Sequence, residues 1–199
     1  MPKQTFLNLS EEKKNRIIGK CYDLFIDLPY EEITIREIVK QVGISIGSFY
    51  KYFEDKEDLY LYLMVKIEKK YLQKQHEKYG QTFLNEETLP LRYACTPKEE
   101  AFNKTWYKVS TEVHQRFYFG PYADELYTWL HDELVAMQLN GLLRKDLDLK
   151  LIYFMYMTSM FNLQIYFKKE NIESDEDIIR IKDEYFRDIL FYGIMENKK

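Results

Sequence analysis

The side chains best suited to hold a phosphate group lie within one short stretch, between Thr34 and Lys56. Thr34 and Ser45 each precede a run of residues with helical spacing, so we expect their hydroxyls to cap free backbone N–H groups. The start of a helix also attracts an anion, because its N–H groups and its dipole favour negative charge. Lys51 and Lys56 add positive charge nearby. The chemistry predicted for this stretch is therefore the binding of phosphate groups.

Two helices joined by a tight turn are the elements that must position these residues. Thr34 and Glu37 have the spacing of a capping box, and apolar residues recur at helical spacing over residues 35–42. Gly43 can adopt the positive φ that ends this helix, and Ser45 can begin a second, very short helix. Two helices joined by a turn that contains glycine predict a helix-turn-helix, whose second helix can lie in the DNA major groove.

Five short motifs follow one another through this stretch and the start of the next helix. They are Thr34–Val39, Val42–Ser45, Gly47, Phe49–Phe53 and Lys56–Leu59. Together they resemble the N-terminal DNA-binding domain of the TetR family of bacterial transcriptional regulators. The resemblance covers roughly residues 8 to 65, about a third of the chain, and implies a three-helix DNA-binding domain. It also implies a protein that works as a dimer on double-stranded DNA.

The residues expected to contact DNA follow from their types and from this resemblance. They are Thr34, Arg36, Ser45, Ile46, Gly47, Ser48, Tyr50, Lys51 and Lys56. The resemblance implies that Tyr50 binds a phosphate, whereas Tyr52 and Phe53 fix the recognition helix to its domain. Tyr50 and Tyr52 are two residues apart and cannot share a helix face. Gly47 has no side chain, which would let the recognition helix approach the base edges closely.

Ile46 departs from the pattern of the family. Many relatives carry Lys or Arg at this position, where the side chain can bond guanine or phosphate, whereas isoleucine makes only apolar contacts. One interpretation is that Ile46 contacts a thymine methyl group and that recognition depends more on the shape of the DNA. The alternative is that Ile46 faces the core of its own domain.

Composition and charge limit the kind of protein. The net charge is −4 at pH 7, and residues 1–60 contain nine Lys/Arg and eleven Asp/Glu. DNA binding must therefore come from a local patch and from polar contacts, and not from a generally basic surface. Cys21 and Cys95 lack the spacing of a metal site, and no signal peptide precedes them. We therefore expect reduced thiols, a cytoplasmic location, and no metal or cofactor.

The chain as a whole predicts an all-α protein of about nine helices. Glycine and proline are few, at seven and five, and the sequence has no alternating strand pattern of useful length. We expect a three-helix helix-turn-helix domain over residues 1–54 and a helical effector-binding and dimerisation domain over residues 55–199, with a connecting helix over 55–80. Further helices are expected to begin near Thr96, Tyr122, Asp148 and Ser174, the first of them continuing to Gly120.

Residues 151–167 carry no charge over seventeen positions. A helix that is apolar all round is buried either in a protein core or in lipid. The segment is short for a membrane span, contains several polar residues and is flanked by lysines, which favours a protein core without membrane association. The rival interpretation is a membrane-associated or adaptor helical protein.

The last two helices are apolar on more than one side, which favours a four-helix bundle with a second copy. The expected dimer contacts are Phe161, Ile165, Ile178, Tyr185, Ile189 and Tyr192. The many aromatic residues between Cys95 and Phe167 are typical of a cavity for a small hydrophobic or aromatic effector, although such stripes are also typical of a plain core. The expected lining residues are Trp106, His114, Tyr118, Tyr127, Tyr153 and Tyr156.

The sequence favours a regulator and not an enzyme. Motifs such as Ser-x-x-Lys, Gly-x-Ser-x-Gly and His-Glu-x-x-His are absent, and the three histidines are scattered. We predict a sequence-specific repressor that binds a palindromic operator as a homodimer and is released by its effector. A regulator controlled by a protein partner, or one that activates transcription, fits the same sequence.

Overall fold

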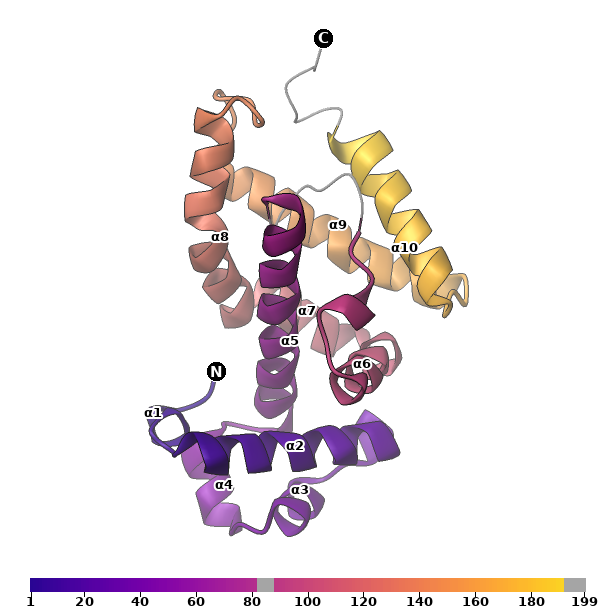
Figure 1. Cartoon of the computed structure of the whole chain (residues 1–199). Coiled ribbons are helices and arrows are strands. Elements are labelled where there is room, and N and C mark those ends of the chain that lie inside the picture. Colours follow the sequence, from indigo (N-terminus) through magenta and orange to yellow (C-terminus); the bar gives the residue numbers. More distant parts are fainter. Residues whose placement is uncertain (82–87, 192–199) are drawn as a thin grey trace. The chain divides into compact units, whose positions relative to one another are not determined.

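The computed structural model describes residues 1–81 and 88–191, and within these ranges it contains ten α-helices and no β-strand (Figure 1). The predicted all-α class is confirmed. The chain packs into two compact units. The first consists of residues 1–68 and 95–113, and the second of the described residues within 69–94 and 114–199.

These units divide the chain differently from the predicted domains, whose expected boundary lies after residue 54. The start of helix α5 (Lys56–Tyr79) and the segment 95–113 belong to the same unit as the N-terminal helices. Aromatic packing accounts for this, since the rings of Tyr60 and Phe102 lie 5.3 Å apart. Packing does not show which residues bind DNA, so the functional boundary stays a prediction.

The first unit contains the predicted helix-turn-helix. Its elements are α1 (Gln4–Leu7), α2 (Glu11–Asp27), η1 (Tyr30–Glu32), α3 (Ile35–Val42), α4 (Ile46–Tyr52), the start of α5, α6 (Pro97–Lys104) and η3 (Thr105–Lys108). The hydroxyls of Ser10, Thr34 and Ser45 accept hydrogen bonds from the N–H three residues on, at 3.3, 3.3 and 3.1 Å. Gly43 has a φ of 76° and ends α3. The signals at Thr34, Gly43 and Ser45 therefore act as the sequence predicted.

The core of the first unit is formed by one face of each helix. Its most deeply buried side chains include Ile17, Cys21, Phe25, Ile38, Val42, Phe49 and Phe53. Helix α1 was not predicted, because four residues are too few to show a helical period. It is nevertheless anchored, since Phe6 is fully buried with its ring 4.7 Å from that of Phe53 and 5.6 Å from that of Tyr62. Burial raises the pKa of the Cys21 thiol to about 12, which suits a structural cysteine.

The second unit consists of longer helices. Its elements are the rest of α5, η2 (Leu91–Tyr93), most of α7 (Thr111–Phe119), α8 (Pro121–Leu139), α9 (Leu149–Lys169), α10 (Asp175–Asp183) and the π-helix η4 (Glu184–Phe191). Asp148 and Ser174 cap α9 and α10 as predicted, accepting backbone N–H groups at 2.7 and 3.4 Å. Gly80 and Gly141 have φ angles of 77° and 73° and follow α5 and α8.

The helix expected from Thr96 to Gly120 is not continuous, which corrects the sequence prediction. Thr105 donates its hydroxyl proton to the carbonyl of Phe102 at 2.7 Å, and η3 follows at this point. Such back-bonding by threonine bends helices. Val109 is then extended, with ψ of 162°, and α7 begins anew at Thr111.

No helix among residues 1–81 and 88–191 is both long enough and apolar enough to cross a membrane. Nor do residues 1–81 and 88–191 contain a cluster of three or more His, Cys, Asp or Glu side chains that could hold a metal ion.

Candidate DNA-binding site

Helix α4 exposes one face and buries the other. Ile46 and Tyr50, which are four residues apart, keep 44% and 47% of their surface exposed. Phe49 and Tyr52 are buried, with 1% and 7% of their surface exposed. The expected opposition of Tyr50 and Tyr52 is therefore present. The alternative in which Ile46 faces the core does not fit its exposure.

The exposed face also contains the other residues expected at the centre of the contact. Gly47 and Lys51 are exposed, and Ser48 is half-buried. The first turn of α4 contains no acidic residue. Ser45 accepts the N–H of Ser48 at 3.1 Å, and the two hydroxyls are 2.9 Å apart. The face is thus a mixture of apolar, hydroxyl and cationic groups that could lie against a nucleic acid.

The start of α3 is different, because it already holds a carboxylate. Glu37 accepts the backbone N–H of Thr34 at 2.7 Å and its hydroxyl at 3.0 Å. These bonds lower the pKa of Glu37 below its ordinary value. A phosphate at Thr34 would compete with this carboxylate for the same donors. Arg36, the second residue of α3, is exposed.

Lys56 is held against the turn between α2 and α3. Its ammonium donates to the carbonyl of Tyr30 at 2.6 Å and lies 4.1 Å from the centre of the Tyr30 ring. Partial burial lowers the pKa of Lys56, while the nearby Glu31, Glu37 and Glu57 act in the opposite direction. The side chain predicted to neutralise phosphate is therefore placed by a specific protein contact.

Sequence reasoning missed Lys3. Its ammonium donates to the carbonyl of Tyr50 at 2.8 Å, and its backbone N–H donates to the carbonyl of Tyr52 at 2.8 Å. A further cation therefore lies at the end of α4, beside the exposed Tyr50. The contact joins residues 47 apart in the sequence, so no local pattern indicates it.

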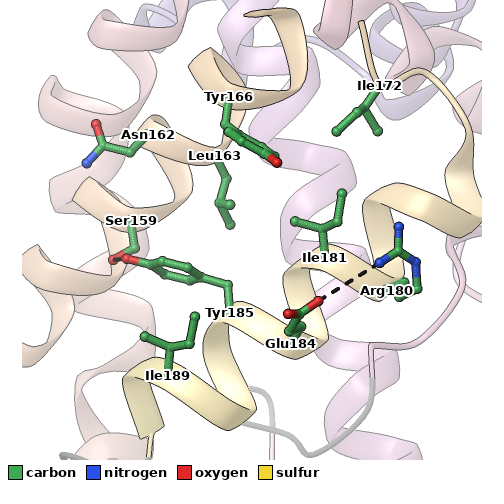
Figure 2. A pocket seen from close by; sticks show the side chains of 10 residues that line it. All are labelled: Ser159, Asn162, Leu163, Tyr166, Ile172, Arg180, Ile181, Glu184, Tyr185 and Ile189. Carbon is green, nitrogen blue, oxygen red and sulfur yellow. Dashed lines mark hydrogen bonds and ion pairs between the residues drawn. The ribbon is translucent and has the colours of Figure 1, made fainter. Parts of the chain in front are cut away.

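In the second unit, a pocket of about 480 Å³ lies between α9 and the helical pair α10 and η4 (Figure 2). It is lined by Ser159, Asn162, Leu163, Tyr166, Ile172, Arg180, Ile181, Glu184, Tyr185 and Ile189. The hydroxyl of Tyr185 donates to that of Ser159 at 3.2 Å, and Arg180 pairs with Glu184 at 3.9 Å. The residues expected to line an effector cavity are not among those of this pocket.

Those expected lining residues have several different surroundings. Tyr127 packs on Tyr153 at 5.1 Å, and the hydroxyl of Tyr153 donates to the carbonyl of Ala123 at 2.7 Å. His114 and Tyr118 are buried, and Tyr156 packs on Phe186. Trp106 belongs to the first unit. The expected effector cavity stays a prediction.

The residues expected to form the dimer contact differ in how exposed they are in the single chain. Ile165 and Ile189 are exposed, Phe161 and Tyr185 are half-buried, and Ile178 is buried within its own chain. Tyr192 lies outside the described residues. The structure adds large exposed apolar side chains on α9 that the prediction omitted: Leu151, Phe154, Met155 and Tyr166.

Comparison with known proteins agrees with this geometry. Residues 17–63 match the family described as bacterial regulatory proteins, tetR family. An HTH-type transcriptional regulator of Staphylococcus aureus is 34% identical over 55 residues, which is 28% of this chain and 30% of that protein. The match therefore spans less than a third of the curated relative.

Two solved structures share the fold over nearly the whole chain. One is a fatty acid degradation regulator from Bacillus halodurans, at 16% identity and a TM-score of 0.50, covering 92% of this chain and 98% of that one. The other concerns control of antibiotic production by bacterial hormones, at 17% identity and a TM-score of 0.50, covering 94% and 100%.

The fold and the exposed α4 define a helix-turn-helix protein. More particularly, the chain carries the DNA-binding domain of the tetR family, as its sequence motifs indicated. Regulatory proteins, and not enzymes, make up the matches described here, in agreement with the lack of enzyme motifs in the sequence.

Proposed function

We propose that the protein is a cytoplasmic transcriptional repressor that binds a palindromic operator as a homodimer and is released by a small hydrophobic or aromatic effector. The observation that carries the DNA-binding part is the outward face of α4, within a domain that matches the tetR family. A short, capped helix with one buried and one exposed face can enter a major groove without unfolding.

The exposed side chains of α4 determine which groups of the DNA this helix would contact. Tyr50 and Lys51 are proposed to bind phosphate oxygens, and Ile46 to contact a thymine methyl group. Because Ile46 forms no hydrogen bond, the base readout should depend on A·T-rich sequence and on DNA shape more than on guanine contacts. Lys3, Lys51 and Lys56 compensate locally for the negative net charge.

A second copy of this chain is the proposed occupant of the exposed face of α9. Leu151, Phe154, Met155, Ile165 and Tyr166 recur there at helical spacing, and all five are exposed in the single chain. An apolar face of this length on a helix whose opposite face is core is typical of a helical dimer interface. Pairing places two recognition helices on one palindromic site.

Buried oxygen atoms in the second unit support the effector. Among residues 1–81 and 88–191, Gln164 Oε1 and Thr158 Oγ1 are buried and have no hydrogen-bond partner, and Gln164 is only 2% exposed. An unsatisfied buried acceptor costs roughly 1–3 kcal/mol. We therefore propose an apolar effector that carries at least one hydroxyl or N–H donor.

Selection of bound sequences from random duplex DNA tests the proposal directly. A palindromic consensus is the expected result, and recovery of unrelated sequences would contradict specific binding. The selected duplex then serves in a screen of apolar phenols, amides and acids for release. Release by a compound with a hydrogen-bond donor supports the effector, whereas release by none of these classes contradicts it.

A further inference from the structure

Lys56 forms two contacts with one residue. Its ammonium donates to the carbonyl of Tyr30 at 2.6 Å and also lies over the ring of Tyr30, 4.1 Å from its centre. A lysine side chain in solution samples many rotamers, so a phosphate that binds it must order it. Two contacts to Tyr30 restrict those rotamers before any DNA arrives.

The ring of Tyr30 is itself fixed by a column of aromatic residues. It stacks on Phe25, with centroids 6.1 Å apart and planes 17° apart. It also meets Tyr60 edge to face, with centroids 5.0 Å apart. Tyr60 in turn stacks on Trp106, at 6.4 Å and 15°. All of these residues belong to the first unit.

A directed hydrogen bond holds the middle of this column. The hydroxyls of Tyr60 and Thr105 are 2.8 Å apart. Because Thr105 donates its only hydroxyl proton to the carbonyl of Phe102, Tyr60 must be the donor to Thr105. Tyr60 is fully buried, and burial raises the pKa of its hydroxyl far above the ordinary value, so the donor stays protonated.

We propose that Tyr30 is a positioning residue for Lys56, and that the column Trp106–Tyr60–Tyr30 makes the position of the Lys56 ammonium depend on η3. Tyr30 does not touch DNA in this scheme. It holds the ammonium where a backbone phosphate can displace the carbonyl of Tyr30 and take its place. The inference rests on the proposed DNA-binding function. It identifies the packing of η3 as a feature on which the phosphate contact of Lys56 depends.

A purely structural role for the column makes a different prediction. An aromatic core that only stabilises the fold would change the fraction of folded protein, but would not change how many counterions are released per bound duplex. A correctly placed lysine that contacts a phosphate contributes about one unit to the dependence of log K on log salt. The salt slope therefore distinguishes positioning from stability.

The test compares Tyr30→Leu with Tyr30→Phe in full-length protein, using the operator selected as described above. The phenylalanine ring keeps the cation–π contact and the backbone carbonyl, so we expect its affinity and salt slope to equal those of the unsubstituted protein. Tyr30→Leu removes the ring, and we expect the salt slope to fall by about one, as it does in Lys56→Ala. Operator affinity in moderate salt should fall about twofold to tenfold.

The outcomes separate this inference from the proposed function. A weaker Tyr30→Leu complex with an unchanged salt slope, or an unchanged complex, overturns the positioning role while leaving DNA binding intact. Absence of duplex binding by the unsubstituted protein overturns the proposed function and this inference together. Circular dichroism melting of each variant verifies that the folded protein is being compared.

A second measurement does not require Tyr30→Leu to fold. The chain contains only two tryptophans, Trp106 and Trp129, so Trp129→Phe leaves Trp106 as the sole indole. We expect operator binding to shift the emission of Trp106 in this background, because a phosphate that replaces the Tyr30 carbonyl on Lys56 alters the packing of Tyr30 and of the column. The shift should disappear in the Lys56→Ala combination. Emission that does not respond to DNA, or that responds equally without Lys56, overturns the coupling.

Discussion

The ammonium of Lys3 lies 2.8 Å from the backbone carbonyl oxygen of Tyr50 and donates a hydrogen bond to it. The same residue donates its backbone N–H to the carbonyl of Tyr52. Orphan carbonyls at the end of a helix favour a cation, both for hydrogen bonding and for the helix dipole. Lys3 therefore both ends α4 and adds charge beside its exposed tyrosine.

From this contact we predict that Lys3→Ala weakens operator binding about threefold to tenfold and lowers the salt slope by up to one. Fluorescence anisotropy with labelled duplex at several salt concentrations measures both. Lys20→Ala is the matched control, since Lys20 is an exposed lysine of α2 and is expected to change neither value. Equal behaviour of the two variants would exclude Lys3 from the interface.

Tyr50 and Tyr52 provide a contrast within one helix. Tyr50 is half exposed, whereas Tyr52 is buried, with its ring 5.7 Å from that of Phe6. Tyr50→Ala should abolish specific binding while the melting temperature and the dimer stay unchanged. Tyr52→Ala should instead lower the free energy of unfolding by about 3–5 kcal/mol, as large-to-small changes in a core do. Tight operator binding by Tyr50→Ala would refute the proposed docking of α4.

Alanine substitutions at two glycines should change the free energy of unfolding in opposite directions, because only one of the two glycines has a positive φ. Gly43 has a φ of 76°, so Gly43→Ala should lower the free energy of unfolding by about 1–2 kcal/mol, although open space surrounds the position. Gly19 lies inside α2 with nothing within 4 Å of an added methyl group. Gly19→Ala should therefore raise stability by about 0.5–1 kcal/mol. Thermal unfolding of both variants under one condition checks the difference in sign.

The elements of the site could be predicted because their signals are local. Thr34, Ser45 and Gly43 specify helix starts and an end through bonds that span three or four residues, and the structure has them as expected. The exposure of Tyr50 follows from the same helix, because the register of α4 is set by Ser45 and by the buried Phe49.

The rest of the site could not be predicted, because it depends on contacts distant in the sequence. Lys3 and Tyr50 are separated by 47 residues, and Lys56 and Tyr30 by 26. No periodicity connects such pairs. The end of the helix before Val109 was missed for another reason. Thr105 is compatible with a continuous helix in the sequence, and only the structure shows that its hydroxyl donates to the carbonyl of Phe102.

The capping box of α3 predicts that the stability of the folded protein depends on pH. The pKa of Glu37 is lowered by its bonds to Thr34, so its contribution to stability is present above the unfolded pKa near 4.5 and is lost as pH falls through the lower folded value. Glu37→Gln should lower the melting temperature at pH 7, and the difference from the unsubstituted protein should shrink toward pH 3. Glu12→Gln, on α2, is the control without a capping-box partner. A difference that is constant from pH 7 to pH 3 would contradict the assignment.

The last prediction concerns the exposed face of α9. Phe154 and Ile165 lie eleven residues apart on that face, and both are exposed in the single chain. If a second copy covers them, Phe154→Asp should bury an unpaired charge at the interface and give a monomer in sedimentation velocity. Loss of the paired recognition helices should then weaken operator binding by about 10²- to 10⁴-fold.

A matched variant distinguishes loss of the dimer from a general effect of surface charge. Leu139, at the end of α8, is the most exposed large apolar side chain of the described residues and lies outside the proposed interface. Leu139→Asp should therefore remain dimeric and bind the operator normally. A dimeric Phe154→Asp protein with full operator affinity would place the dimer contact on another face and leave the apolar stripe of α9 without its proposed occupant.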